Sequence, residues 1–407
     1  MKRYQVIACA TAFMMASCGL SEIGGTWSGT PDDGVWGGPI DGDGSGAGVL
    51  EATCCMTVLD YSRGYDWKAD PDMGSVKCSL AVYMDGRPVM KVPVGASYEV
   101  GADPDMHRMI DRHLYTDYST ESETVIKKDG EFLFRYQGRE IICGMDVKDD
   151  TLYTLGINRD GEGFSFRGNG QVMFSRENGR VMGTMRREGN SICFAYCEKI
   201  RTADGNVERY YVSKGGTVSQ IAVREDVVKV WDILPGPEYE VYVATLVGIP
   251  RPVLVYGEHL AIFDLPKGWT MLSCTLSALD GTVAAEVTCR DSDGAIRSGI
   301  WADGKMRAVF EKGYVISAMC MSDDGVCCAM NPVAGGGSGR IYRCGETYDM
   351  PEGYVCMGNG GMSMVNGVLH VGLSSADGGW PVMWKDAHAD TIRVNGYIAT
   401  VSAILPR

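Results

Sequence analysis

From about residue 50 onward, short apolar runs alternate along the chain with turns rich in Gly, Asp and Asn. The segment Trp269–Gly313 shows this most clearly, with apolar runs of five to eight residues at 270–277, 282–289, 295–301 and 306–310. Such runs predict β-strands, and the Asp-Gly pairs between them favour tight hairpins because both turn residues adopt positive φ. No stretch of this region has the 3.6-residue period of an amphipathic helix. The pattern therefore predicts units of four antiparallel strands.

The unit recurs along the chain, marked by a Gly, an aromatic residue and a short apolar run. Clear copies of this phrase begin at Gly268, Gly313, Gly353 and Gly396, with spacings of 45, 40 and 43 residues. Weaker copies begin at Gly95, Gly138 and Gly179. Four strands repeated about every 44 residues are typical of the blades of a β-propeller. We therefore expect an all-β fold of the propeller class over residues 51–407.

Counting the units gives eight blades, with seven as the alternative because the unit after Gly95 is the least regular. Seven complete units are expected to begin near Ala96, Arg139, Arg180, Val227, Trp269, Tyr314 and Tyr354. The eighth is divided between the two ends of the chain. Tyr397–Leu405 has the pattern of a lone first strand, and Glu51–Gly95 supplies three strands without a first one. Pairing these two segments would close the ring and remove its exposed sheet edges.

The first 50 residues predict an export signal and a spacer. Residues 1–18 combine a positive start, an apolar stretch too short to span a bilayer, and Met15-Ala16-Ser17-Cys18, which resembles a bacterial lipobox. The resemblance implies a lipid on Cys18 that tethers the protein to a membrane, with an ordinary signal peptide as the alternative. The Gly- and Asp-rich residues 19–50 predict a flexible linker.

Together, the lipobox and the repeats resemble outer-membrane lipoproteins of the Bacteroidetes type that carry a β-propeller domain, without identifying a subfamily. The resemblance implies a location at the outer membrane, on either its periplasmic or its cell-surface side. The net charge of −14 and the lack of a run of Lys and Arg argue against nucleic acid as a partner.

Cysteine is unusually frequent, with 15 residues. Thirteen remain after Cys9 and Cys18, and an odd number cannot all pair within one chain. Most lie within apolar runs, which favours buried thiols. The alternatives are disulfides, for instance among Cys320, Cys327, Cys328 and Cys344, or a zinc site. The spacings do not support zinc, so no metal or other cofactor is predicted.

Catalytic motifs are sparse. There are five His, and no nucleophile elbow or His-Glu-x-x-His motif. His370 lies inside an apolar run, which favours a core or channel position. The segment from Ser375 to Trp380 only partly resembles the Asp-rich turns of sialidase propellers. No catalytic residue is assigned, and the sequence favours a protein that is not an enzyme without excluding one.

The most promising ligand-binding loop is Ser62–Ser75. It combines Tyr65 and Trp67 as stacking surfaces with Asp66, Asp70 and Asp72 as hydrogen-bond acceptors, which suits a glycan or a cationic ligand. The alternative is that Trp67 only covers its own blade. Three functions follow: a binding propeller for a glycan or peptide, a glycan-active hydrolase or lyase with its site at the channel mouth, or a protein–protein scaffold. A large exposed apolar patch would favour the scaffold.

Overall fold

The computed structural model describes residues 52–60, 77–84, 87–94 and most of 107–406. The gaps within the last range are 112, 120–122, 130, 139, 159–162, 203–204, 237–239, 280–281, 303, 323–324, 334–337, 357–360, 366, 376–379, 387 and 393–397. The predicted signal segment and linker lie outside the described residues. Within these residues, secondary structure consists almost entirely of strands, β1 to β33. No helix among them is long and apolar enough to cross a membrane.

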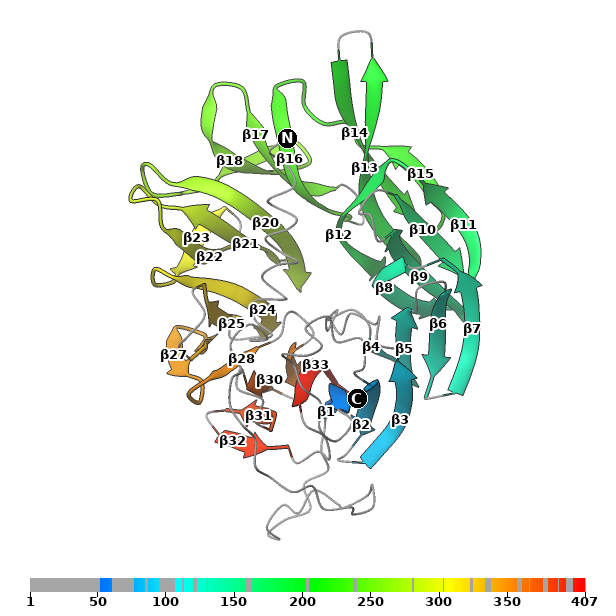
Figure 1. Cartoon of the computed structure of the whole chain (residues 1–407). Coiled ribbons are helices and arrows are strands. Elements are labelled where there is room, and N and C mark those ends of the chain that lie inside the picture. The colour runs from blue at the N-terminus through cyan, green and yellow to red at the C-terminus, as the bar shows by residue number, and fades with distance from the viewer. Residues whose placement is uncertain are drawn as a thin grey trace, which may run out of the picture. The chain divides into compact units, whose positions relative to one another are not determined.

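The chain forms two compact units. Unit 2 comprises residues 117–126 and 132–316, and unit 1 comprises 1–116, 127–131 and 317–407. Four sheets of unit 2 each contain four consecutive strands in sequence order (Figure 1). The first contains β8 (Glu140–Lys148), β9 (Thr151–Asn158), β10 (Phe164–Gly168) and β11 (Gln171–Arg176). The second contains β12 (Gly179–Glu188), β13 (Ser191–Thr202), β14 (Gly205–Lys214) and β15 (Thr217–Gln220).

The third sheet of unit 2 contains β16 (Val227–Leu234), β17 (Val241–Leu246), β18 (Ile249–Tyr256) and β19 (His259–Ile262). The fourth contains β20 (Thr270–Leu279), β21 (Thr282–Arg290), β22 (Ile296–Ala302) and β23 (Lys305–Val309). A further sheet has strands whose residues are divided between the units: β4 (His107–Ile110), β5 (His113–Ser119), β6 (Glu123–Lys128) and β7 (Glu131–Gln137).

Unit 1 contains three sheets. One has the order β3-β2-β1-β33 and consists of β1 (Ala52–Asp60), β2 (Lys77–Met84), β3 (Arg87–Val94) and β33 (Ile398–Pro406). Another, whose first strand begins in unit 2, consists of β24 (Tyr314–Ser322), β25 (Gly325–Pro332), β26 (Arg340–Arg343) and β27 (Glu346–Asp349). The third has five strands: β28 (Tyr354–Cys356), β29 (Met362–Val365), β30 (Val368–Ser375), β31 (Val382–Lys385) and β32 (His388–Thr391).

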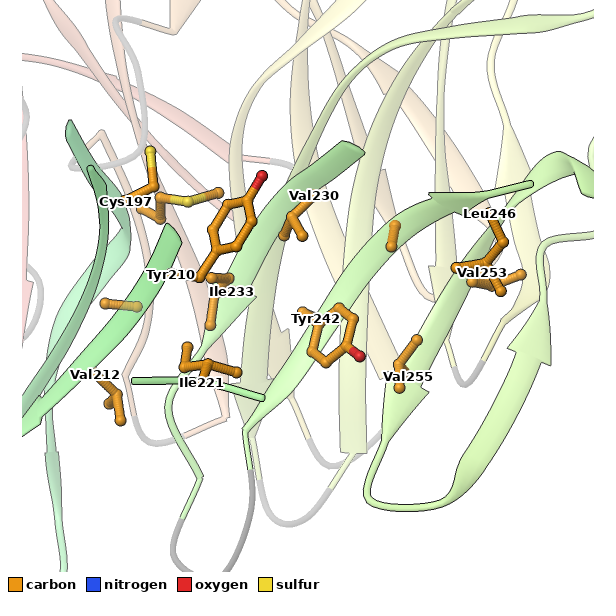
Figure 2. Close-up of a cluster of buried hydrophobic side chains, with 13 residues drawn as sticks. Cys197, Tyr210, Val212, Ile221, Val230, Ile233, Tyr242, Leu246, Val253 and Val255 are labelled. Atoms are coloured by element: carbon orange, nitrogen blue, oxygen red, sulfur yellow. The ribbon is translucent and has the colours of Figure 1, made fainter. Parts of the chain in front are cut away.

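Neighbouring sheets of unit 2 pack with their apolar faces together. Between the β12–β15 and β16–β19 sheets, thirteen buried side chains form a core that includes Tyr210, Ile233 and Tyr242 (Figure 2). The first strands of successive sheets are also in contact, β8 with β12, β12 with β16 and β16 with β20. Burying both faces of each sheet in this way makes the repeated sheet the unit of stability, as in a propeller blade.

The expected fold class is confirmed: the described residues are all-β and consist of repeated four-stranded antiparallel sheets. The expected unit starts at Arg139, Arg180, Val227, Trp269, Tyr314 and Tyr354 each lie within one residue of the first strand of a sheet. The expected pairing between the two ends of the chain is present as a strand pair, with Thr57 of β1 opposite Thr400 of β33. The sheet after Gly353 differs from expectation because both β28 and β29 pair with β30, which gives five strands instead of four.

Candidate functional site

The sequence-predicted site residues cannot be placed. Tyr65, Asp66, Trp67, Asp70 and Asp72 lie outside the described residues, as does Cys18. Their roles therefore remain predictions. Among the described residues, the structure instead assembles polar and apolar side chains at the outer strand β7 and at β11, the outer strand of the next sheet.

A buried ion pair lies where β7 meets this next sheet. Glu140 is the first residue of β8, and Arg167 lies on β10. The guanidinium donates to both carboxylate oxygens, at 2.8 Å from Nη2 and 3.4 Å from Nε. Their side chains are only 6% and 10% exposed. Gly156 makes room for the carboxylate, since a Cβ there would lie 2.2 Å from Glu140 Oε2. Such a two-point contact fixes the guanidinium plane.

The ion pair anchors β7 through its aromatic residues. The guanidinium carbon of Arg167 lies 4.0 Å from the ring centre of Tyr136, a cation–π contact. Burial, and then the nearby charge of Glu140, raise the pKa of the Tyr136 hydroxyl. Two residues earlier on β7, the Phe134 ring lies against Gly170, where a Cβ would come within 2.9 Å of the ring. Asn169 and Gly170 both have positive φ and form a tight turn. Because Gly170 has no side chain, the Phe134 ring can pack directly against the backbone of this turn.

Anchoring one part of β7 leaves its beginning exposed. Phe132 is 60% and Leu133 39% exposed, and on β11 Val172 is 53% and Met173 55% exposed. Met173 is the extra residue of a β-bulge, because Phe166 and Arg167 of β10 stand opposite Phe174 and Val172. We call Phe132, Leu133, Val172 and Met173 the edge surface. The apolar side chains of these four residues are therefore exposed on the outer strands of two neighbouring sheets.

Outer strands expose unpaired backbone groups, and proteins usually protect them. In this chain β15, β19, β27 and β32 have four residues each, β11 and β23 are bulged, and β3 contains Pro88 and Pro93. By contrast, β7 has seven residues, Glu-Phe-Leu-Phe-Arg-Tyr-Gln, without a proline. On one face of β7, Glu131 and Arg135 flank Leu133. The side chain of Arg135 is 65% exposed and lies 3.7 Å from Glu123.

Two carboxyl groups with raised pKa values lie on the inner strands of unit 2. Asp232 of β16 is 5% exposed, and its Oδ2 accepts the Leu276 N–H of β20 at 2.7 Å. Burial raises its pKa to about 6, although hydrogen bonds from backbone N–H groups, including that of Gly183 on β12, act in the opposite direction. Asp232 thus joins three inner strands, which is a structural role. Burial also raises the pKa of Glu286 on β21 to about 7. Raised carboxyl pKa values are the signal that would favour an enzyme.

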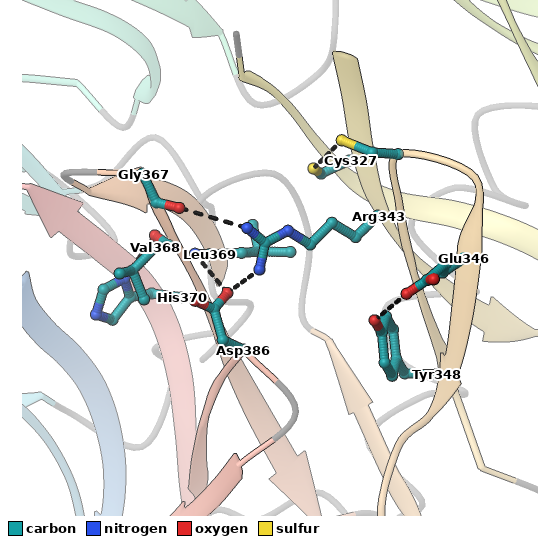
Figure 3. A network of polar contacts seen from close by, with 10 residues as sticks. Cys327, Arg343, Glu346, Tyr348, Gly367, Val368, Leu369, His370 and Asp386 are labelled. Carbon is teal, nitrogen blue, oxygen red and sulfur yellow. Dashed lines mark hydrogen bonds and ion pairs between the residues drawn. The ribbon is translucent and has the colours of Figure 1, made fainter. Parts of the chain in front are cut away.

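In unit 1, a polar network joins two sheets (Figure 3). Arg343, the last residue of β26, donates to Asp386 and to the Gly367 carbonyl, and Asp386 also accepts the Leu369 N–H at 3.3 Å. His370 on β30 is buried, with Nδ1 3.1 Å from the Val368 carbonyl oxygen, so the sequence expectation of a core or channel imidazole agrees with its position. Within the described part of the chain, no cluster of three or more metal-ligating side chains is found.

Comparison with known proteins finds only remote structural similarity. No protein-family model and no curated protein matches the chain. Among solved structures, the β-propeller domain of the Trilobed protease from Pyrococcus furiosus matches 74% of this chain and 97% of its own, at 10% identity and a TM-score of 0.43. The dihydro-heme d1 dehydrogenase NirN in complex with DHE matches 84% of this chain and 72% of its own, at 12% identity and a TM-score of 0.48. A prolyl endopeptidase structure matches 82% and 55%, at 11% identity and a TM-score of 0.44.

These similarities are too low to transfer a ligand, substrate or partner. The repeated four-stranded sheets with successive first strands in contact define the chain as a protein with a β-propeller domain. Sequence reasoning missed the edge surface. Its only sequence signal is the run Phe132-Leu133-Phe134, which departs from alternation in the last strand of a unit.

Proposed function

We propose that this protein is a membrane-tethered, extracytoplasmic interaction propeller that binds an extended polypeptide segment at β7. The edge surface carries the proposal, because more than half of the Phe132 and Met173 surface is exposed on neighbouring outer strands. Exposed apolar groups that gather on neighbouring outer strands are typical of interaction sites. A long outer strand also offers backbone N–H and C=O groups to which a partner can add a strand.

The chemistry of β7 specifies the partner segment. Leu133 lies between the acidic Glu131 and the basic Arg135 on one face of the strand. An antiparallel partner strand with an apolar centre, a basic residue facing Glu131 and an acidic residue facing Arg135 complements this order. The buried Arg167–Glu140 pair keeps β7 rigid, which lowers the entropic cost of binding.

The lipid anchor on Cys18, the signal segment 1–18 and the outer-membrane location are part of the same proposal and rest on the lipobox resemblance. Mass spectrometry of the protein purified from bacterial membranes tests the anchor directly. A diacylated Cys18 at the new N-terminus supports it, and a soluble chain cleaved elsewhere contradicts it.

We further propose that the eight sheets are blades of one ring, closed by β33 beside β1, with seven blades as the alternative count. In the β1–β33 pairing, Ala403 lies opposite Cys55. The variant Ala403→Cys should therefore form a disulfide with Cys55 under mild oxidation, and failure to form it argues against closure. An experimental structure that shows seven blades would overturn the count of eight.

Peptide and glycan arrays probed with the purified full chain test the binding function. We expect array peptides of the stated pattern to bind, and Leu133→Lys together with Met173→Lys to weaken binding about tenfold or more, as for central interface residues. The control Val247→Lys alters another exposed residue, 68% accessible, at the β17–β18 turn and should bind normally.

Replacing Tyr65 and Trp67 by Ala separates the loop hypothesis from the edge-surface hypothesis. Glycan binding that disappears with these two substitutions, and not with the Leu133 and Met173 substitutions, would replace the polypeptide by a glycan as the ligand. A second copy of β7 is a competing occupant, because an antiparallel copy of β7 itself has the complementary charge order. Size-exclusion chromatography at several protein concentrations tests for such self-association. A concentration-dependent dimer that Leu133→Lys abolishes would show self-association instead of partner binding.

A further inference from the structure

Three cysteines gather in the β24–β27 sheet. Cys327 lies on β25, Cys344 directly follows β26, and Cys320 lies on β24. The sulfur atoms of Cys327 and Cys344 are 4.0 Å apart (Figure 3). A hydrogen bond with Cys327, and then burial, raise the pKa of the Cys320 thiol. Cys327 therefore interacts with both of the other thiols.

The three thiols differ in their access to solvent. Cys344 is exposed, Cys320 is partly buried, and Cys327 has no exposed surface. An oxidant in solution therefore meets Cys344 first. The Cys344 sulfur contacts that of the buried Cys327, which a large reagent cannot reach directly. This order of exposure is typical of an attacking and a resolving cysteine, in which the accessible sulfur is oxidised first.

The backbone brings the sulfur of Cys344 back toward β25. Cys344 and Gly345 have φ values of 47° and 104° and form the turn between β26 and β27. The Cys344 N–H donates to the Val326 carbonyl at 3.4 Å, and a Cβ at Gly325 would lie 3.9 Å from the Cys344 sulfur. Positive φ at this position favours Asn, Asp or Gly. The conformation of the turn therefore does not explain why a cysteine stands here. The contact of its sulfur with Cys327 does offer a reason for the cysteine.

We propose that Cys327 and Cys344 form a redox-active pair that closes to a disulfide by exchange with a small disulfide compound. The Cys344 thiolate attacks one sulfur of that compound, which gives a mixed disulfide and releases one thiolate. The Cys327 thiolate then attacks the Cys344 sulfur, which forms the Cys327–Cys344 bond and releases the second thiolate. Two electrons pass to the small disulfide, which ends as two thiols.

The reaction requires only local movement. A disulfide has a sulfur–sulfur distance of about 2 Å, so the two atoms must approach by about 2 Å. Rotation of the exposed Cys344 side chain in its turn supplies this. The bond would tie the β26–β27 turn to β25 and reduce opening of this part of the sheet. The site is independent of the edge surface and of the proposed binding function.

Mass spectrometry of the purified full chain tests the pair. The protein is incubated with reduced or oxidised glutathione, unfolded in N-ethylmaleimide and digested with trypsin. Cys327 falls in peptide 313–340 with Cys320 and Cys328, and Cys344 falls in peptide 344–385 with Cys356. We expect the oxidised sample to contain these two peptides joined, with fragment ions that assign the bond to Cys327 and Cys344.

Variants make the assignment decisive. Cys344→Ser should abolish the joined peptides, whereas Cys328→Ser and Cys356→Ser, which alter buried neighbours, should retain them. The proposal is overturned if the peptides stay joined in Cys344→Ser. It is equally overturned if oxidised wild-type protein shows N-ethylmaleimide on Cys327 with or without glutathione on Cys344. In either case the native pair does not exchange.

Discussion

Replacing Glu140 by Gln tests whether the buried ion pair anchors β7. The substitution keeps the size of the side chain and removes its charge, so the Arg167 guanidinium stays buried without a counter-charge. Removing one partner of a buried pair costs about 3–5 kcal/mol in general. Arg167 keeps its contact with the Tyr136 ring at 4.0 Å and with the Gly170 carbonyl at 3.3 Å. These contacts offset part of the loss, so we expect about 2–4 kcal/mol.

Urea unfolding followed by circular dichroism measures this loss as a lower midpoint at unchanged slope. The double variant Glu140→Gln with Arg167→Met removes both charges and separates the pair from its surroundings. Because the two side chains interact directly, we expect the double variant to lose at least about 1.5 kcal/mol less than the sum of the single variants. As a control, Asp226→Asn breaks an exposed pair with Arg224 at 3.0 Å and should leave the midpoint unchanged.

Two results would refute the anchoring argument. A loss below about 1 kcal/mol for Glu140→Gln would mean that water or a rearranged Arg167 compensates the missing carboxylate. Additive single and double variants would mean that the two residues do not act together. The same variants connect stability to binding, because a loosened β7 should bind the partner segment more weakly even though no exposed residue has changed.

The remaining predictions concern the inner strands. Because the folded-state pKa of Asp232, about 6, lies above its unfolded value, stability from this residue is lost as pH rises from about 4 to 6. Asp232→Asn should remove this loss, which amounts to about 3 kcal/mol, from the plot of urea midpoint against pH. A variant whose plot keeps the same pH dependence would contradict the raised pKa of Asp232. Gly183 has φ of 64°, and an added Cβ would lie 2.5 Å from the Ile233 carbonyl oxygen. Gly183→Ala should therefore lower the urea midpoint clearly more than Gly189→Ala, where φ is 56° and an added Cβ would meet no atom within 4 Å. Equal losses would show that the positive φ alone, without the contact to Ile233, determines the loss.

The sequence predicts the strands well because their signals are local. Alternating apolar residues and Asp-Gly turns depend on neighbours in the chain, and the repeat phrase marks each unit without any long-range information. Even the pairing of β1 with β33 is predictable, since a lone first strand at one end complements three strands at the other. The separation of β28 from β29 was not predicted, although the sequence between them contains Asn359-Gly360, a turn signal of the kind that separates strands elsewhere in the chain.

The side-chain clusters were not predictable for a different reason. Glu140 and Arg167 are 27 residues apart, and nothing in their local patterns shows that β8 and β10 bring them onto one side of a sheet. Cys327 and Cys344 are 17 apart, and the sequence offered several equally good pairings among four cysteines. Which of them meet depends on the register of β25 and β26 and on the turn at Cys344. Such contacts follow from the way strands pair, and composition and spacing do not encode it.

The contrast between β7 and the other outer strands links fold to function. A repeat protein can protect every outer strand by the same means, because each sheet repeats the same design. Here seven outer strands are short, bulged or interrupted by proline, whereas β7 is long and is anchored by a costly buried ion pair. If stability were the only requirement, apolar residues in place of Glu140 and Arg167 would serve at least as well. A charged anchor behind an exposed Phe132 and Leu133 is therefore better explained by the need to hold β7 in a fixed orientation for a partner.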